Sequence, residues 1–417
     1  MKVCLFTHTF PFGKNVEAFI ENELAVAAHL DANITIVPLR RKKGIRALPS
    51  NVTVCCDLAD TDLWVRMKCL CKLIFSKAIW HLRRSSDPPQ NIGEFLKGAK
   101  YLYAALLVEA FITKHTGMVS DMDVLYSYWF NHTPMGLFWG IRNSRIKKPA
   151  VMTRAHGYDV YERAIGSYIP YRDETLKSID MVFAISEYGC KYMCGKYPVS
   201  KEKITVSKLG VLPIEKKHGQ SSDEDKSVSL VSCSNVVYVK RVSLILRSIL
   251  RYAETHPELK ISWTHIGGGV NYDCLRQEVE EIKSRNTVPN LCVTLTGVVS
   301  NTQVREIYSE KHFDCFINLS ESEGIPVSIM ECISAGIPVL ACDVGGMKEI
   351  VTEETGLLLD KDFHFEDFSL NMDKILSNKE YYKKSVSLFF SRNYDAERNY
   401  TDFYNRLFSL SHENTAD

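Results

Sequence analysis

Short apolar stretches alternate along the chain with polar turns and with stretches of helical periodicity. Residues 3–6 form an apolar run that ends in a turn at Gly13, and residues 17–30 then repeat apolar positions at helical spacing. The same order returns later in the first half of the chain, at residues 33–38, 124–128, 150–153 and 181–185. Strands that alternate with helices in this way predict a parallel sheet covered by helices.

Residues 213–227 lose this periodicity and are rich in charged and small polar residues, which indicates an exposed linker. A second series of apolar stretches follows at residues 228–233, 261–266, 293–295, 315–319 and 339–341. We therefore expect an α/β chain with two Rossmann-like domains, residues 1–212 and 228–385, and without shorter repeats.

Composition places the chain among ordinary globular proteins, with 45% hydrophobic and 24% charged residues in 417. No apolar run approaches the roughly 18 residues that predict a membrane span. The 13 cysteines show no metal-like spacing, so we expect reduced thiols in a cytoplasmic protein rather than a disulfide framework.

The net charge of +1 conceals an asymmetry between the two halves. Residues 1–212 carry 29 Lys/Arg against 19 Asp/Glu, and the remainder carries 22 against 31, which gives +10 and −9. Only the first half is suited to an anionic surface.

The stretch from Ser320 to Pro338 carries the most informative pattern of polar residues. It predicts a strand, a tight turn at Gly324, a helix with Pro326 at its first position, and a helix end before Gly336. The N-terminus of such a helix, at the carboxyl edge of a sheet, is a natural phosphate site. Carboxylates would repel a bare phosphate, so Glu323 and Glu331 either accept hydrogen bonds from sugar hydroxyls or form a solvated pair beside the loop.

This stretch resembles the E-x7-E signature of retaining glycosyltransferase family 4, written here as E-G-x-P-x-x-x-x-E followed by A-G-x-P-V. Further pieces of the family pattern occur in order, at residues 19–24, 154–159, 240–242 and 344–350. The resemblance implies a GT-B fold, in which a cleft separates the two Rossmann-like domains. It also implies an acceptor-binding first domain, a second domain that binds a nucleotide sugar, and a C-terminal helix, residues 386–417, that crosses back to pack on the first domain.

The resemblance also implies roles for individual residues of the second domain. Glu323 would hold hydroxyls of the donor sugar, Glu331 would hold the ribose, and Lys240 would lie on the diphosphate as a fixed cation. Backbone amides near the sugar and phosphate would come from the turn and helix start, namely Gly324, Ile325, Val327 and the neighbours of Pro326. In the first domain His156 would face the donor sugar and the acceptor, and Arg154 and Asp159 are weaker candidates.

The sequence departs from the family pattern at two places. The first strand is followed by the single glycine Gly13 rather than a glycine-rich loop, so Lys14 is expected to compensate electrostatically. Asn235 follows the first strand of the second domain, where the family often has an arginine, and Arg241 is a candidate substitute.

The nucleotide base is expected to lie near Gly297 and Val298, which follow the predicted strand at residues 293–295. The triplet of glycines at residues 267–269 is only weak evidence for a nucleotide-binding loop. Without a G-x-G-x-x-G helix start or a Walker lysine, NAD and ATP chemistry are disfavoured.

The family resemblance implies a retaining transfer without a metal ion or other cofactor, because protein cations and helix ends take the place of a divalent ion on the diphosphate. The transfer would place the acceptor on the face of the sugar from which the phosphate departs. Two rivals remain open, namely a nucleotide-sugar epimerase of the same fold and a catalytically silent binding subunit.

Residues 63–84 contain six Lys/Arg and no acidic residue. Leu63, Met67, Leu70, Ile74 and Ala78 form one stripe at helical spacing, which is typical either of a helix packed on the first sheet or of an interfacial helix on anionic lipid. Basic residues 40–43 favour the membrane alternative. Both alternatives stay open, and the second would give peripheral contact with the inner face of the plasma membrane through residues 40–84. The expected acceptor is a lipid-linked glycan of bacterial surface polysaccharide synthesis, and nucleic acid is not expected as a partner.

Overall fold

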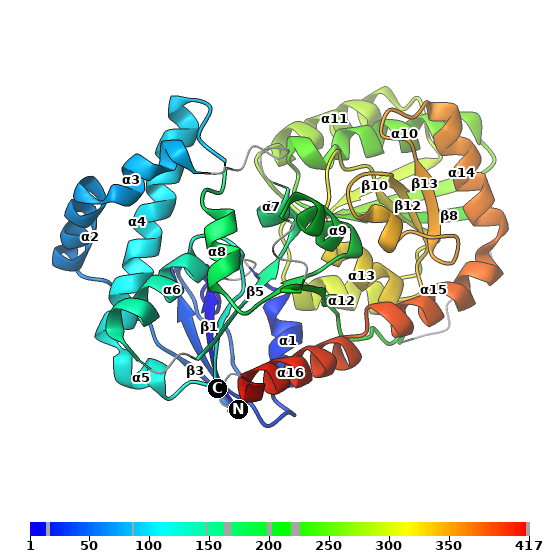
Figure 1. Ribbon diagram of the computed structural model, residues 1–417. Coiled ribbons are helices and arrows are strands. Elements are labelled where there is room, and N and C mark those ends of the chain that lie inside the picture. Colours follow the sequence, from blue (N-terminus) through cyan, green and yellow to red (C-terminus); the bar gives the residue numbers. More distant parts are fainter. Residues whose placement is uncertain are drawn as a thin grey trace. The chain divides into compact units, whose positions relative to one another are not determined.

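The computed structural model describes residues 1–13, 17–85, 87–146, 149–161, 168–197, 202–217 and 226–413. Two compact units divide the chain (Figure 1). Unit 1 comprises Met1–Leu209 together with Glu397–Asp417, and unit 2 comprises Gly210–Ala396. The predicted pair of parallel sheets wrapped by helices is confirmed, with one sheet in each unit.

Unit 1 contains a seven-stranded sheet in the order β3-β2-β1-β4-β5-β6-β7, and all neighbouring strands are parallel. Its strands are β1 (Lys2–Thr7), β2 (Asn33–Pro38), β3 (Val52–Val54), β4 (Val124–Ser127), β5 (Ala150–Ala155), β6 (Met181–Ala184) and β7 (Ile204–Val206). The sequence did not predict β3 and β7, because three residues at a sheet edge are too few for a recognisable pattern.

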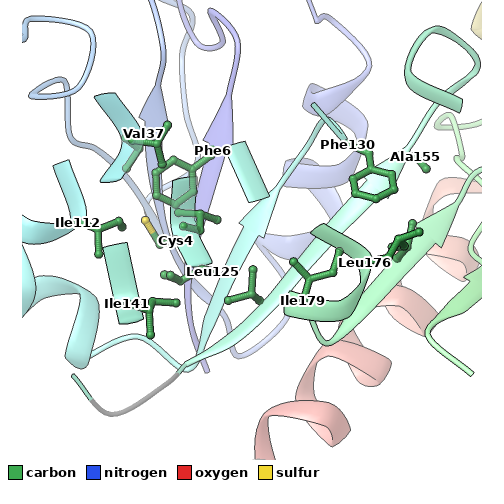
Figure 2. Packing of buried hydrophobic residues seen from close by; sticks show 14 of the residues in the cluster. Cys4, Phe6, Val37, Ile112, Leu125, Phe130, Ile141, Ala155, Leu176 and Ile179 are labelled. Atoms are coloured by element: carbon green, nitrogen blue, oxygen red, sulfur yellow. The ribbon is translucent and has the colours of Figure 1, made fainter. Parts of the chain in front are cut away.

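Helices cover both faces of this sheet, because successive side chains of each strand point to opposite sides. Val3 and Leu5 of β1 pack in one buried cluster with α1 and the C-terminal helix, whereas Cys4 and Phe6 pack in the other with α4 and α6. Figure 2 shows the second cluster, in which Phe6 lies among side chains from neighbouring strands and helices. The helices of unit 1 are α1 (Ile20–Ala27), α2 (Leu63–Phe75), α3 (Lys77–His81), α4 (Ile92–Lys114), α5 (Thr116–Ser120), α6 (Thr133–Ser144), α7 (Gly157–Val160), α8 (Arg172–Ser178), α9 (Glu187–Lys196) and α16 (Ala396–Glu413), with the 3-10 turn η1 (Leu82–Arg84).

The C-terminal helix α16 packs on the first sheet, as the family resemblance implies. The ring of Phe403 lies 5.3 Å from that of Tyr126 and 5.0 Å from that of Phe183, measured between centroids. Tyr404 and Leu407 complete this buried contact. The return to unit 1 begins at Glu397 rather than at residue 386, because the preceding helix α15 packs on α13 of unit 2.

Unit 2 contains a six-stranded parallel sheet in the order β10-β9-β8-β11-β12-β13. Its strands are β8 (Ser227–Cys233), β9 (Lys260–Ile266), β10 (Leu291–Leu295), β11 (Cys315–Asn318), β12 (Val339–Cys342) and β13 (Gly356–Leu359). The accompanying helices are η3 (Tyr238–Lys240), α10 (Val242–Thr255), α11 (Tyr272–Arg285), α12 (Asn301–Glu310), α13 (Val327–Ser334), η4 (Met347–Glu349), α14 (Phe365–Ser377) and α15 (Lys379–Asn393).

The first part of the expected linker is held against unit 2 rather than free. Arg305 of α12 donates hydrogen bonds to the carbonyl oxygens of Leu212 and Pro213, and the side chain of Lys216 donates to Tyr308 O. Residues 218–225 of the expected linker lie outside the described residues, and β8 already begins at Ser227. None of the described helices has the length and apolar character needed to cross a membrane.

Candidate functional site

The second sheet gathers the predicted polar motifs at the carboxyl ends of three strands. Lys240 and Arg241 follow β8, Glu323 follows β11, and Gly345 follows β12. In the sheet β11 lies between β8 and β12, so the three strand ends meet at one edge. Open α/β sheets bind their ligands at this edge.

The ammonium group of Lys240 and the carboxylate of Glu323 form an ion pair at the centre of this group. Lys240 Nζ lies 2.5 Å from Glu323 Oε1, and Asn318 Nδ2 donates to the same oxygen at 3.3 Å. The Glu323 side chain is 8% exposed and that of Lys240 is 25% exposed. A lysine ammonium has three N–H donors, so Lys240 can keep this contact and still bind an anion.

Glycine at position 345 allows the loop after β12 to pack directly on the loop that carries Glu323. Gly345 has φ +57°, and a Cβ atom there would lie 1.9 Å from the carbonyl oxygen of Glu323. A Cβ at Gly346 would lie 2.7 Å from the carbonyl oxygen of Gly324. The two family motifs, at residues 323–331 and 344–350, therefore touch each other through backbone atoms.

Helix α13 begins directly after this loop, with Pro326 at its N-cap position in extended conformation. The prediction placed Pro326 one residue further into the helix. No side chain caps α13, whose N-terminal residues all lie in the described part of the chain. Because the first turn of a helix has unsatisfied N–H groups and a partial positive charge, the start of α13 at Val327 is suited to an anion. The side chain of Ile325 is buried, so that residue could contact a ligand only through its backbone.

Glu331 lies further along α13, in a buried environment that it shares with α12. Its Oε1 accepts a hydrogen bond from Asn301 Nδ2 at 2.5 Å. Burial raises the pKa of the Glu331 carboxyl to about 7, against the smaller opposing effects of Asn301 and Arg305. Asn301 and Arg305 were not predicted from the sequence, although their spacing of four residues, directly after the expected base-binding loop, is a signal that could have identified them.

Arg241 holds loops of unit 2 together through its side-chain hydrogen bonds. Its Nε donates to Leu319 O at 2.5 Å, and its two terminal nitrogens donate to Lys361 O and Cys342 Sγ, each at 3.1 Å. These contacts give no support to Arg241 as a substitute phosphate cation. Asn235 is exposed on the loop after β8.

The glycines after β9 pack on the neighbouring loops of unit 2. Gly267 forms an isolated bridge with Gly297, and a Cβ on Gly267 would lie 2.0 Å from Ser234 O. A Cβ on Gly268 would lie 2.6 Å from Val298 Cγ2, and the Val298 side chain is 69% exposed. The triplet therefore has a packing role, and Val298 remains accessible to a ligand.

His156 of unit 1 lies at the carboxyl end of β5 among aromatic rings. Its Nε2 atom lies 3.1 Å from Tyr128 O, and its ring centroid lies 5.1 Å from that of Tyr128 and 4.6 Å from that of Trp129. Burial lowers the pKa of the imidazole to about 3, with a smaller effect in the same direction from Arg154. A neutral imidazole can hydrogen-bond to a carbonyl oxygen only by donating, so Nε2 carries the proton.

The turn after β1 is closed by a carboxylate, Glu17, that the sequence pattern does not identify. Glu17 accepts hydrogen bonds from the backbone N–H groups of His8, Thr9 and Phe10 at 2.7–2.9 Å, and from Trp129 Nε1 at 2.6 Å. Consecutive N–H groups of this kind form an anion-binding concavity. In this structure the protein's own carboxylate fills the concavity.

Gly13 forms internal hydrogen bonds through both of its backbone polar groups. Its N–H donates to Gly44 O at 3.0 Å, and its carbonyl oxygen accepts from Arg46 Nε at 2.9 Å. Gly13 has φ +84°, which favours glycine. Lys14, the expected electrostatic compensation, lies outside the described residues.

Arg154 and Asp159 have structural partners within unit 1. The side chains of Arg154 and Glu23 are both fully buried, with Arg154 Nη2 lying 3.4 Å from Glu23 Oε2, and Arg154 Nε donates to the Tyr126 hydroxyl at 2.7 Å. Asp159 accepts from His156 N at 2.5 Å and from Phe130 N at 2.7 Å. These two motif residues therefore stabilise the edge of the sheet on which His156 lies.

The described residues contain no group of three or more His, Cys, Asp or Glu side chains placed to hold a metal ion. That finding concerns metal ligands contributed by this chain alone. The expectation of a metal-independent reaction remains a prediction.

Comparison with known families and proteins places unit 2 among glycosyl transferases. The family described as Glycosyl transferases group 1 matches residues 213–387. Similar proteins include the GtfA subunit of the UDP-N-acetylglucosamine–peptide N-acetylglucosaminyltransferase of Streptococcus agalactiae, 25% identical over 49% of this chain and 39% of the relative. The O-antigen biosynthesis glycosyltransferase WbnH of Escherichia coli is 31% identical over 29% of this chain and 31% of the relative. The matches thus span less than half the length of these curated relatives.

Solved structures match nearly the whole chain at low sequence identity. The apo lipopolysaccharide outer core galactosyltransferase WaaB aligns with a TM-score of 0.65 and 14% identity, over 98% of this chain and 99% of the other. Anabaena HepE, solved in complex with UDP and glucose, aligns with a TM-score of 0.63 and 13% identity, over 98% of this chain and 100% of the other. These likenesses confirm the GT-B fold that the family resemblance implies.

Proposed function

We propose, from the premise that this chain belongs to the group 1 glycosyl transferases through residues 213–387, that it is a retaining glycosyltransferase. Its donor would be a sugar linked to a nucleoside diphosphate, and its acceptor would be a hydroxyl group. UDP-linked donors are the first to test, because UDP is present in the HepE complex.

One arrangement in unit 2 carries the proposal, namely the Lys240–Glu323 ion pair beside the uncapped start of α13. The helix start and Lys240 would bind the diphosphate, because both offer positive charge and N–H donors. Glu323 would accept hydrogen bonds from hydroxyls of the donor sugar. Glu331 would accept them from the ribose, as a carboxylate does in dinucleotide-binding folds.

In the proposed reaction the bond between the anomeric carbon and the phosphate oxygen breaks, and a bond from that carbon to the acceptor oxygen forms on the same face. The proton of the acceptor hydroxyl passes to the departing phosphate. Lys240 and the N–H groups of α13 would stabilise the negative charge that grows on the phosphate. His156 would orient the sugar as a neutral hydrogen-bonding group rather than transfer a proton, because burial holds its pKa near 3.

The proposed acceptor is a lipid-linked glycan of bacterial surface polysaccharide synthesis, used at the inner face of the plasma membrane. Support comes from two similar proteins, one of O-antigen biosynthesis and one of the lipopolysaccharide outer core. The positive charge of residues 1–212 also favours an anionic membrane surface.

The test is a screen of UDP- and GDP-sugars by thermal shift and mass spectrometry, with wild type and two variants. Glu323→Gln removes the negative charge of the carboxylate that is proposed to accept hydrogen bonds from the donor sugar. Glu321→Gln is the matched control, because Glu321 lies in the same loop but forms an exposed ion pair with Lys361 at 3.1 Å.

We expect a donor that stabilises the wild type and is slowly hydrolysed, with both effects lost in Glu323→Gln and kept in Glu321→Gln. NMR of the product of transfer to an acceptor hydroxyl should then show the same anomeric configuration as the donor. Conversion of the donor into an isomer without acceptor would establish an epimerase instead. Absence of binding by every donor would indicate a silent binding subunit.

A further inference from the structure

Helix α2 of unit 1 presents large nonpolar side chains to solvent. We define the outward face of α2 by six side chains whose exposed fractions lie between 41% and 86%. They are Leu63, Trp64, Met67, Leu70, Ile74 and Phe75. One alternative for the stripe containing Leu63, Met67, Leu70 and Ile74 is packing on the first sheet, and the exposure of these four side chains contradicts it. Ala78, the fifth member of the stripe, is partly buried on α3 instead.

A different stripe of α2 makes the contact with the rest of unit 1. Cys69 and Leu73 are buried, and Val65 is partly buried, in a cluster with Leu102 and Leu106 of α4. These three residues of α2 follow one another at intervals of four, so they form a single line along the helix. Because α2 already packs on α4 through this line, the outward face has no partner among the described residues of unit 1.

Basic residues border the outward face. At 3.6 residues per turn, Arg66 lies on one edge of this face, and Lys68 and Lys72 lie on the other. Lys72 is paired with Glu109 at 2.6 Å, whereas Lys68 lies over the ring of Trp64 at 5.3 Å. The whole segment of residues 63–84 carries six Lys/Arg and no acidic residue.

The helices that follow α2 also expose large nonpolar side chains. Trp80 of α3 is 73% exposed, and Ile92 at the start of α4 is 80% exposed. In Figure 1 α2 and α3 follow each other at the periphery of unit 1, and α4 runs beside them. Soluble proteins seldom expose so many large nonpolar side chains together unless the surface contacts another molecule or a membrane.

We propose that the outward face of α2 lies in the interface of an anionic lipid bilayer, with its nonpolar side chains among the upper acyl chains and its basic edges at the headgroups. A helix of 13 residues is only about 20 Å long, so it suits a position in the plane of the membrane and not across it. This inference rests on the peripheral membrane contact included in the proposed function, but it does not depend on the transfer reaction.

The chemistry of the surface favours lipid over a protein partner. A helix that combines a nonpolar face with Lys and Arg along its edges is the pattern of interfacial helices. Exposed tryptophans such as Trp64 and Trp80 are suited to the boundary between headgroups and acyl chains. A second copy of the same basic face would be repelled, because residues 63–84 carry no acidic residue to compensate.

The experiment measures co-sedimentation of the full chain with vesicles, either equimolar phosphatidylglycerol and phosphatidylcholine or phosphatidylcholine alone. One variant, Trp64→Ser/Phe75→Ser, removes nonpolar surface, and a second, Arg66→Gln/Lys68→Gln, removes one charge from each basic edge. The matched control is Leu370→Ser/Leu388→Ser, because both leucines are more than half exposed on helices of unit 2. Tryptophan quenching by brominated lipid reports insertion directly.

We expect wild type and control to bind the anionic vesicles and their tryptophans to be quenched. Each α2 variant should bind at least about tenfold more weakly, since each removed charge is worth about fivefold and each large nonpolar side chain lost from the interface about tenfold or more. High salt should weaken binding of the wild type. Equal vesicle binding by wild type and the Trp64→Ser/Phe75→Ser variant would overturn the proposal, and so would no binding by the wild type.

A wild-type dimer that the Trp64→Ser/Phe75→Ser variant converts to monomer, without vesicle binding, would overturn the proposal in favour of self-association. Thermal shift with UDP, measured on the same samples without lipid, separates this result from the proposed function. A variant that still responds to UDP but no longer binds vesicles has lost only the membrane contact. If the chain binds vesicles but binds no donor, the membrane proposal is supported and the transferase proposal is not.

Discussion

Lys240 Nζ and Glu323 Oε1 lie 2.5 Å apart, although the two residues are separated along the chain by three strands of the second sheet. The pair brings a cation and a carboxylate together beside the start of α13. Each charge partly neutralises the other in the absence of donor. A donor would therefore find one group ready for its phosphates and one for its hydroxyls, at a small cost of rearrangement.

Loss of Lys240 should lower transfer strongly, because a fixed cation beside a growing phosphate charge stabilises the transition state. For Lys240→Met we expect kcat to fall by about 10²–10³, the effect typical of one removed transition-state contact. The variant Lys361→Met is the matched control, since it breaks the exposed ion pair with Glu321 and should leave kcat nearly unchanged. UDP release measures both. Equal rates for Lys240→Met and wild type would contradict the assigned role.

The contact between Gly345 and Glu323 should make position 345 intolerant of any side chain. In Gly345→Ala the new Cβ would collide with Glu323 O and would also be strained at φ +57°. We expect loss of donor binding and a free energy of unfolding lower by about 1–3 kcal/mol. Gly44→Ala separates the two causes, because Gly44 has φ +81° with no heavy atom near the added Cβ. Similar losses in both variants would show that backbone strain alone is responsible.

Glu331 should make unit 2 less stable as the pH rises from about 4.5 to about 7. Because burial raises its folded pKa to about 7 from 4.5, the folded state holds the proton more tightly, and this stabilisation is lost as the pH rises through 7. Glu331→Gln keeps an oxygen for Asn301 but does not ionise. We expect its free energy of unfolding to exceed that of wild type by on the order of 3 kcal/mol above pH 7, and by little at pH 4. Denaturant titrations across this range measure the difference, and a constant difference would refute the prediction.

His156 should remain neutral throughout the physiological range. Its folded pKa is lowered to about 3 by burial, so its contribution to stability is present above pH 6.5 and is lost as the pH falls toward 3. In NMR titrations its ring signals should therefore not move between pH 5 and 8. Movement of the His156 signals near pH 6.5 would indicate a solvated ring, available for proton transfer.

Removing one partner of the buried pair of Arg154 and Glu23 should destabilise unit 1, because the other charge then stays buried without a partner. Arg154→Met would leave the Glu23 carboxylate buried without a cation, and we expect a loss of about 3–5 kcal/mol in the free energy of unfolding. Adding Glu23→Gln should recover much of this loss, because no buried charge then remains. Lys2→Met breaks the exposed pair with Asp121 and should change stability by at most about 1 kcal/mol. If the double variant is as unstable as Arg154→Met, the penalty lies in lost packing around Phe403 instead.

The sequence by itself determined the alternation of strands and helices and the motifs at the ends of particular strands. Local periodicity and turn chemistry are carried by neighbouring residues, so β1, β4, β5, β8, β9 and β11 could be predicted within a few residues. The spacing from Glu323 to Glu331 likewise predicted a loop followed by a helix. Short edge strands such as β3 and β7 carry too little pattern to be recognised.

Only the tertiary structure decided which partner each of these side chains meets. Arg154 and Arg241 stand in recognisable motifs, yet their guanidinium groups bond to buried groups and backbone carbonyls, and Glu17 fills the turn after β1. Helix α2 illustrates the reason, since it has nonpolar residues on two opposite sides. Periodicity reports that a face is nonpolar, but burial depends on which neighbour reaches it. In α2 the line of Val65, Cys69 and Leu73 contacts α4, and the outward face remains exposed.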